Sequence, residues 1–315
     1  MGVNGQLGSL LAAQYINCGF KVVGVARSES NIKHPNFRYV RYGEDFMHEK
    51  IECNSILVNA AANSVVREVH SGANVSGTFK YFQNILLLNK DKIAWAIHFV
   101  SSEMFGIPNA KKQDLNTELD PINEYGQIKL KEKLECDKMI SEGYKILCLG
   151  LFNFESPLRS SRFFTKKVIS FLNDEERILE IFNWRSQRDF GLATELVIYI
   201  VKEMTDKWIG YDFIGAKNPL TIRDFIVKSS VLLDYSVTEH YKDRIEIRKS
   251  DINKIFLFAA NDKVDEQRNF CFSGLSKNSP QLSFTKGDDF IQQLLNQHNE
   301  YSDNTGTWWF KRYSK

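Results

Sequence analysis

The stretch Gly2-Val3-Asn4-Gly5-Gln6-Leu7-Gly8 opens the chain and decides its fold. Its glycines follow the spacing GxxGxxG, and the apolar residues after it recur with the period of a helix. In such a loop the first glycine permits a tight turn, the second lets backbone N–H groups approach a pyrophosphate, and the third lets the helix pack on a sheet. The helix N-terminus then presents its positive end to the phosphates. The pattern predicts a dinucleotide-binding loop formed by Gly2, Gly5, Gln6, Leu7 and Gly8.

Strand and helix patterns alternate beyond this loop. Residues 20–26, 55–59 and 95–100 are apolar and strand-like, whereas residues 75–88 and the segment around Tyr125 are helical. Alternation of this kind predicts an α/β fold with a Rossmann-type doubly wound parallel sheet, whose right-handed crossovers gather the strand ends at one edge. The strand expected before the glycine loop is missing, since only Met1 precedes Gly2. A truncated or mis-started reading frame and a genuine loss both explain this.

The composition is that of a soluble globular chain. Of 315 residues, 43% are hydrophobic and 25% are charged, which argues against disorder and fibrous repeats. The longest apolar runs are far shorter than the ~20 residues of a membrane span. A net charge of +2 is too balanced for nucleic acid or anionic lipid to be the default partner. The scattered cysteines and histidines lack metal-ligand spacing, so we expect reduced thiols, no metal site and a cytoplasmic location.

Two segments that follow strands carry further cofactor signals. Arg27 and Ser28 come directly after the strand at 20–26, where a carboxylate would bond the ribose of NAD and an arginine would accept the 2′-phosphate of NADP. This favours NADP over NAD, the alternative being that Arg27 only solvates a strand end. Asn59, Ala60 and Ala61 end the strand at 55–59, and their small side chains allow close approach of a cofactor.

Tyr125 and Lys129 are four residues apart and therefore share one face of a helix. A tyrosine, with an ordinary pKa of about 10, is a poor base at neutral pH. A neighbouring ammonium and a cationic nicotinamide ring both favour its phenolate. Ser101, at the tip of the strand at 95–100, can hydrogen-bond the same substrate oxygen. The three residues, taken with the glycine loop, form a specific set, although the Tyr-x-x-x-Lys spacing alone is common.

In order and spacing these motifs resemble the extended short-chain dehydrogenases/reductases, a family of epimerases and dehydratases acting on nucleotide sugars. A second block narrows the resemblance to GDP-mannose 4,6-dehydratases: Leu151-Phe-Asn-Phe-Glu-Ser-Pro-Leu-Arg159, Arg162-Phe-Phe-Thr-Lys-Lys167 and Gln187-Arg-Asp-Phe-Gly191. The resemblance covers about residues 2–230. It implies a Rossmann domain over residues 1–150 and a smaller C-terminal α/β substrate lobe over 151–315, interleaved with the first.

The resemblance also implies roles for single residues. Tyr125 would be the base, Lys129 its electrostatic partner and ribose anchor, Ser101 the hydroxyl donor and Glu103 the acid/base that distinguishes dehydratases. The residues expected to hold the nucleotide sugar are Ser102, Asn153, Lys167 and Arg188. Cations and amide donors suit a diphosphate independently of any resemblance.

The leading hypothesis is a nucleotide-sugar 4,6-dehydratase with a GDP-mannose-like substrate and tightly bound NADP. The sugar would be oxidised transiently at carbon 4, lose water through Glu103 and regain hydride at carbon 6. If Glu103 is only a surface carboxylate, the alternative is a 4-keto reductase or epimerase with the same tyrosine and lysine. An alternative of another class is a non-catalytic dinucleotide-binding protein. The resemblance further implies a homodimer or homotetramer.

Overall fold

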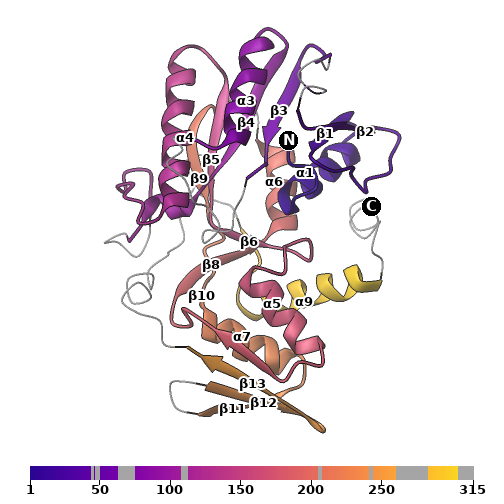
Figure 1. Cartoon of the computed structure of the whole chain (residues 1–315), viewed down its shortest axis with the longest axis vertical. Coiled ribbons are helices and arrows are strands. Elements are labelled where there is room, and N and C mark those ends of the chain that lie inside the picture. Colours follow the sequence, from indigo (N-terminus) through magenta and orange to yellow (C-terminus); the bar gives the residue numbers. More distant parts are fainter. Residues whose placement is uncertain are drawn as a thin grey trace.

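The computed structural model describes residues 1–43, 46, 50–62, 75–107, 113–204, 208–240, 244–259 and 283–303. These residues form two lobes stacked along the long axis of the molecule, with the N-terminal elements in the upper lobe (Figure 1). In this part of the chain we find no helix with both the length and the apolar character that a membrane crossing requires.

The upper lobe is built on parallel strands. β3, β4, β5 and β9 pair in that order, and β1 pairs with β2 beside them, every pairing being parallel. The predicted α/β fold with a parallel sheet is thereby confirmed. The strands are β1 (Val22–Ala26), β2 (Phe37–Arg41), β3 (Ser55–Asn59), β4 (Ile93–Ser101), β5 (Ile146–Leu151) and β9 (Gly210–Ile214).

The short segment Met1–Val3 lies between β1 and β3 and bonds to both. The N–H groups of Gly2 and Val3 donate to the carbonyl of Val25 on β1 at 2.8 and 3.3 Å. On the other side, the N–H of Ala60, directly after β3, donates to the carbonyl of Met1 at 3.1 Å. This segment thus joins the two ladders at their carboxyl ends, at the position of the strand that the sequence analysis expected before the glycine loop.

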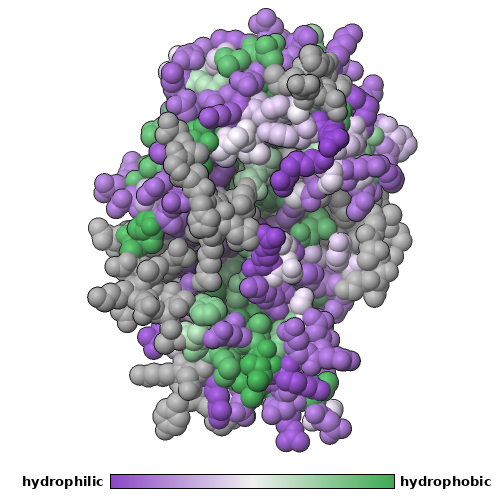
Figure 2. Space-filling model, viewed as in Figure 1, coloured by the Kyte–Doolittle hydropathy of each residue, from purple (hydrophilic) through white to green (hydrophobic). Residues whose placement is uncertain are grey.

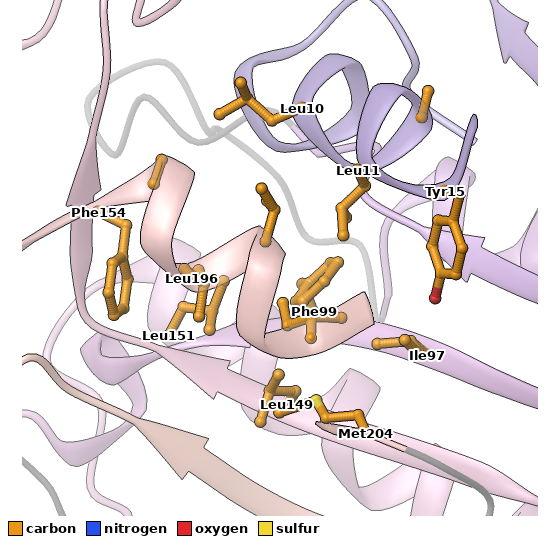
Figure 3. Packing of buried hydrophobic residues seen from close by; sticks show 14 of the residues in the cluster. Leu10, Leu11, Tyr15, Ile97, Phe99, Leu149, Leu151, Phe154, Leu196 and Met204 are labelled. Carbon is orange, nitrogen blue, oxygen red and sulfur yellow. The ribbon is translucent and has the colours of Figure 1, made fainter. Parts of the chain in front are cut away.

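Helices cover both faces of the sheet, and the alternation of side chains along the strands decides which face each residue meets. Ile97 and Phe99 of β4 pack under α1 and α6, as Figure 3 shows. Their neighbours Ala96 and Val100 point to the opposite face and pack under α3 and α4. The helices of this lobe are α1 (Gln6–Asn17), α3 (Gly77–Leu88), α4 (Glu124–Ser141) and α6 (Ala193–Glu203).

The lower lobe has smaller sheets. β6, β8 and β10 form one, in the order β10-β8-β6, and β11, β12, β13 and β7 form another, with α5, α7 and α9 packed around a separate core. The strands are β6 (Asn153–Glu155), β7 (Ile178–Ile181), β8 (Gln187–Leu192), β10 (Pro219–Thr221), β11 (Ser236–His240), β12 (Arg244–Lys249) and β13 (Ile252–Phe258). The helices are α5 (Phe164–Asn173), α7 (Ile222–Leu232) and α9 (Gly287–Asp303).

In the part of the chain that the structure describes, the passages between the lobes are short: residues 215–218 join β9 to β10, and two other passages are shorter still. One residue, the buried Phe152, separates β5 in the upper lobe from β6, and α6 follows β8 directly. Because β9 pairs with β5, residues beyond 150 return to the upper sheet. The division expected at residue 150 is therefore crossed by α6 and β9, and the two lobes are interleaved.

Candidate active site

The residues expected to bind a cofactor gather at the carboxyl edge of the upper sheet. The glycine loop runs into the first turn of α1, Arg27 and Ser28 follow β1, and Asn59, Ala60 and Ala61 end or follow β3. A parallel sheet brings such strand ends together, which is where doubly wound folds bind ligands. The surface between the lobes is hollowed on the face drawn in Figure 2.

The glycine loop packs against the end of β3 more closely than any side chain would allow. A Cβ on Gly2, whose φ is +79°, would lie 2.7 Å from the Cα of Ala61, and a Cβ on Gly8 would lie 2.0 Å from the carbonyl oxygen of Gly2. Gly5 caps α1 without a side-chain hydrogen bond, and the first turn carries no acidic residue. The first-turn N–H groups are thus left for an anion, so the loop fits the pyrophosphate of a dinucleotide.

Two side chains of the loop bind it to neighbouring segments of the chain. Asn4 Nδ2 donates to the carbonyl of Ser28 at 2.8 Å and to the carbonyl of Glu29 at 3.2 Å. Gln6 Nε2 donates to the carbonyl of Phe154 on β6 at 2.6 Å. Asn4 therefore ties the loop to the segment that begins at the exposed Arg27, and Gln6 ties it to the lower lobe.

Ser101, Ser102 and Glu103 stand where β4 runs into the short 3₁₀ helix η2 (Ser102–Phe105). The Ser101 hydroxyl oxygen accepts from the N–H of Glu103 at 3.2 Å and so caps η2. The carboxylate of the half-buried Glu103 accepts from Asn123 Nδ2 at 2.7 Å. Ser102 is buried. Asn123 was not among the residues expected from the sequence.

Tyr125 and Lys129 occupy the first turns of α4, and both are buried. Lys129 Nζ lies 6.0 Å from the centre of the Tyr125 ring. Asn123 caps this helix, since its Oδ1 accepts from the N–H of Gly126 at 2.8 Å. One amide side chain therefore connects Glu103 with the start of the helix that carries Tyr125.

Lys129 is not a free ammonium, because a buried carboxylate on the next turn holds it. Lys129 Nζ donates to Glu132 Oε2 at 2.7 Å and to the carbonyl of Phe99 at 3.3 Å. His98 Nε2 lies 3.0 Å from the same carboxylate oxygen, while His98 Nδ1 lies 3.1 Å from Asn59 Nδ2. Because an amide nitrogen only donates, His98 accepts at Nδ1 and donates its Nε2 proton to Glu132.

The electrostatics of this cluster favour one charge pair. Burial alone would raise the pKa of Glu132, but the ammonium of Lys129 and the bond from His98 outweigh it and hold that pKa far below its ordinary value. Burial likewise opposes the charge of Lys129, yet Glu132 raises the pKa of this lysine above its ordinary value. Burial lowers the pKa of His98, so the imidazole is neutral at physiological pH. Lys129 and Glu132 therefore form a buried ion pair beside Tyr125.

Of the residues expected to contact a nucleotide sugar, two lie on paired strands. Asn153 begins β6, Arg188 lies on the neighbouring β8, and Asn153 Nδ2 reaches the carbonyl of Asp189 at 3.5 Å. Burial raises the pKa of Asp189 to about 6. The N–H groups of Asn218 and Lys217 donate to its carboxylate and lower this pKa, but burial has the larger effect. Lys167 is exposed on α5.

Sequence reasoning missed Asn123, His98, Glu132 and Asn4. Two signals were available: an asparagine two residues before Tyr125 suits an N-cap, and Glu132 is three residues from Lys129, so the two share a helix face. Nothing in the sequence indicated that His98, on β4, would reach the same carboxylate, because that contact depends on how α4 lies against the sheet.

With this geometry established, the fold is recognisable as that of the Rossmann-type nucleotide-sugar dehydratases and epimerases. The dTDP-glucose 4,6-dehydratase DesIV from Streptomyces venezuelae, solved with NAD, superimposes with a TM-score of 0.73 at 15% identity, covering 98% of this chain and 97% of that one. A dTDP-glucose 4,6-dehydratase from Bacillus anthracis in complex with NAD gives 0.71 at 16% identity, covering 99% and 97%. A UDP-N-acetylglucosamine 4-epimerase from Methanobrevibacter ruminantium gives 0.67 at 18% identity, with the same coverage.

The chain belongs to the GDP-mannose 4,6 dehydratase family, whose model matches residues 1–269. Among its curated relatives, the GDP-mannose 4,6-dehydratase sdnI of Sordaria araneosa is 23% identical over 255 residues, which are 71% of this chain and 46% of the relative. A GDP-mannose 4,6-dehydratase of Sinorhizobium fredii (strain HH103) is 25% identical over 226 residues, 62% of this chain and 64% of the relative. The chain thus spans about half of the first relative and less than two thirds of the second.

Proposed function

We propose that this chain is a nucleotide-sugar 4,6-dehydratase. The observation that carries the proposal is the half-buried carboxylate of Glu103, bonded at 2.7 Å to the residue that caps the helix of Tyr125. A dehydratase needs a carboxylate beside its tyrosine, because it must remove a carbon-bound proton as well as a hydroxyl proton. The names of the curated relatives support a GDP-hexose as the substrate.

The first step would use Ser101, Tyr125 and Lys129. Tyr125 takes the proton of the carbon-4 hydroxyl, while the hydroxyl of Ser101 donates a hydrogen bond to the same oxygen. Lys129, whose Nζ lies 6.0 Å from the centre of the Tyr125 ring, would be its electrostatic partner and would anchor the ribose. A nicotinamide dinucleotide held by the glycine loop would supply the hydride chemistry between carbon 4 and carbon 6.

The second step would use Glu103. The ketone at carbon 4 acidifies the hydrogen at carbon 5, and Glu103 removes it as a proton while the carbon 6–oxygen bond breaks. This proton and the departing hydroxide leave as one water. The proton that Tyr125 took balances the one that carbon 5 regains when hydride arrives at carbon 6. The net change is loss of water, and the chain's own task is to position the groups and move protons.

The cofactor is proposed to be NADP, held by the glycine loop, by Asn59, Ala60 and Ala61, and at its 2′-phosphate by Arg27 and Ser28. Both are exposed directly after β1, where a phosphate can reach them. The structural neighbours bound to NAD leave the preference open. Calorimetric titration with both dinucleotides tests this preference. Arg27→Ala should weaken the binding of NADP more than the binding of NAD.

The nucleotide diphosphate would be bound by Asn153, Lys167 and Arg188, with Ser102 beside the sugar. We also propose a cytoplasmic homo-oligomer. The exposed Leu87 and Leu88 of α3 and Leu134 of α4 are apolar surface that a second copy would cover. Light scattering after size-exclusion chromatography, which measures the mass of the assembly in solution, tests this.

The test is to incubate the purified protein and NADP with GDP-, CDP-, UDP- and dTDP-hexoses. Mass spectrometry should find loss of one water from a single nucleotide class, without net cofactor reduction, and Glu103→Gln should abolish it. Conversion of a 4-keto sugar without water loss would instead support a reductase or epimerase, which the likeness to the 4-epimerase also favours. Dinucleotide binding without any turnover would indicate a binding protein.

A further inference from the structure

The side chain of Asn123 uses both ends of its amide at the candidate active site. Its Oδ1 accepts from the N–H of Gly126 at 2.8 Å, and its Nδ2 donates to Glu103 Oε2 at 2.7 Å. Capping requires only the oxygen, which serine, aspartate or threonine would supply equally well. Asparagine differs from these three residues because it adds an N–H donor, which here is aimed at a carboxylate. The second bond is therefore not explained by capping.

The backbones around Asn123 are packed too closely to move independently. A Cβ on Gly126 would lie 2.6 Å from the carbonyl oxygen of Glu103, and a Cβ on Gly106, whose φ is +61°, would lie 1.8 Å from the carbonyl oxygen of Asp120. The segment after β4 and the start of α4 thus meet at two backbone contacts, with the bond from Asn123 to Glu103 as a third connection. Only this third connection touches the carboxylate itself.

This arrangement determines how Glu103 lies relative to Tyr125. The backbone contacts fix the Cα positions, but a glutamate has rotatable bonds beyond its Cα and would otherwise sample several rotamers. A charge-assisted hydrogen bond to a carboxylate is short and directional. The bond at Oε2 therefore selects one orientation of the Glu103 side chain beside the helix that carries Tyr125.

We propose that Asn123 is a positioning residue, which aims the carboxylate of Glu103 at carbon 5 of the sugar while it anchors the helix of Tyr125. The proposal rests on the function proposed above. In the step concerned, the electron pair of the carbon 5–hydrogen bond becomes the carbon 5–carbon 6 double bond. The proton passes to Glu103, and the carbon 6–oxygen pair leaves with the hydroxide, which takes up that proton as water. Asn123 itself exchanges no proton.

The experiment compares variants that keep the cap with one that loses a cap elsewhere. Asn123→Ser and Asn123→Asp both retain an oxygen for Gly126, but neither supplies the amide donor. Thr221→Ala removes the capping box of α7 in the lower lobe, away from Glu103. For each protein, single-turnover absorbance of reduced nicotinamide follows oxidation at carbon 4, and mass spectrometry follows loss of water.

We expect Asn123→Ser to oxidise carbon 4 at close to the wild-type rate and to lose water about 10- to 100-fold more slowly, the range for a hydrogen bond to a charged group. Asn123→Asp places a second carboxylate beside Glu103, and two neighbouring carboxylates disfavour each other's ionisation. Loss of water by this variant should therefore also be slow, and it should recover as the pH rises. Thr221→Ala should lower the melting temperature and change neither step. Equal slowing of both steps in Asn123→Ser, or no slowing of elimination, would overturn the proposal.

A second measurement separates this proposal from the proposed function. The melting temperatures of Asn123→Ser, Glu103→Ala and the double variant form a cycle that needs no turnover, since alanine at position 103 leaves no acceptor for Asn123. Non-additive shifts support the bond between the two side chains even if no nucleotide sugar reacts, in which case only the dehydratase function fails. Additive shifts show that the two side chains are not coupled, and the positioning role then fails whatever the activity.

Discussion

Replacing Glu132 by glutamine should destabilise the protein strongly. Its carboxylate is fully buried and accepts from Lys129 Nζ, from His98 Nε2, and from the N–H and hydroxyl of Ser76. Glutamine keeps an oxygen for some of these donors but leaves the ammonium of Lys129, 4% exposed, without a counter-charge. Breaking a buried pair in this way costs about 3–5 kcal/mol. In chains somewhat shorter than this one, each kcal/mol of lost stability lowers the melting temperature by ~2–4 °C. The melting temperature of Glu132→Gln should therefore fall by roughly 10 °C.

Urea denaturation at several pH values is the assay. In the wild type the lowered pKa of Glu132 adds stability that is lost as the pH falls below the unfolded value of about 4, and the raised pKa of Lys129 adds stability that is lost as the pH rises above about 10. Between these limits the contribution is constant. In Glu132→Gln, burial becomes the largest influence on Lys129 and lowers its pKa, so this variant should regain stability as the pH is raised from 7 to 9.

Two controls make the result specific. Lys133 and Asp137 form a salt bridge on the same helix at 2.6 Å, with Asp137 40% exposed, so Asp137→Asn should cost less than about 1 kcal/mol. The double variant Lys129→Met with Glu132→Gln removes both charges of this pair and should recover most of the loss. A Glu132→Gln protein within about 1 kcal/mol of the wild type, at a stability independent of pH, would refute the buried ion pair.

Other substitutions test the cofactor loop and the lower lobe. Gly8→Ala places a Cβ 2.0 Å from the Gly2 carbonyl oxygen, so calorimetry should detect no dinucleotide binding and the melting temperature should fall. Asn4→Ala releases the backbone after β1, and the dissociation constant for the dinucleotide should rise by about tenfold, as for a typical hydrogen bond; an unchanged constant would contradict the role of Asn4. Burial raises the pKa of Asp189 from 3.8 to about 6, so stability should fall as the pH rises from about 4 to about 6. In Asp189→Asn, urea denaturation should find this fall absent.

The sequence was sufficient for those parts that follow from local pattern. The glycine loop, the apolar strands of the upper sheet and the Tyr125–Lys129 spacing can each be identified from neighbouring residues alone. In the structure, the loop, the carboxyl ends of these strands and the first turns of α4 meet at one edge of the sheet. Lys129 shows the limit: its spacing from Tyr125 was predictable, but its pairing with Glu132 and His98 depends on the packing of α4 against β4. The role of Asn123 likewise depends on the close approach of Glu103 to Gly126, which joins segments separated by a loop.

The passage from β5 to β6 through the single buried residue Phe152 has a mechanical consequence. A hinge needs a few residues free to change φ and ψ, and neither this passage nor the direct run of β8 into α6 offers any. In the third passage, residues 215–218 between β9 and β10, the N–H groups of Lys217 and Asn218 are bonded to the carboxylate of Asp189. Ligand capture should therefore proceed without the lobes swinging together, and small-angle scattering should record nearly the same radius of gyration with and without nucleotide sugar. In a molecule built this way, specificity is encoded in side chains around a rigid frame, and exchanging those side chains should alter substrate choice without altering how the lobes move.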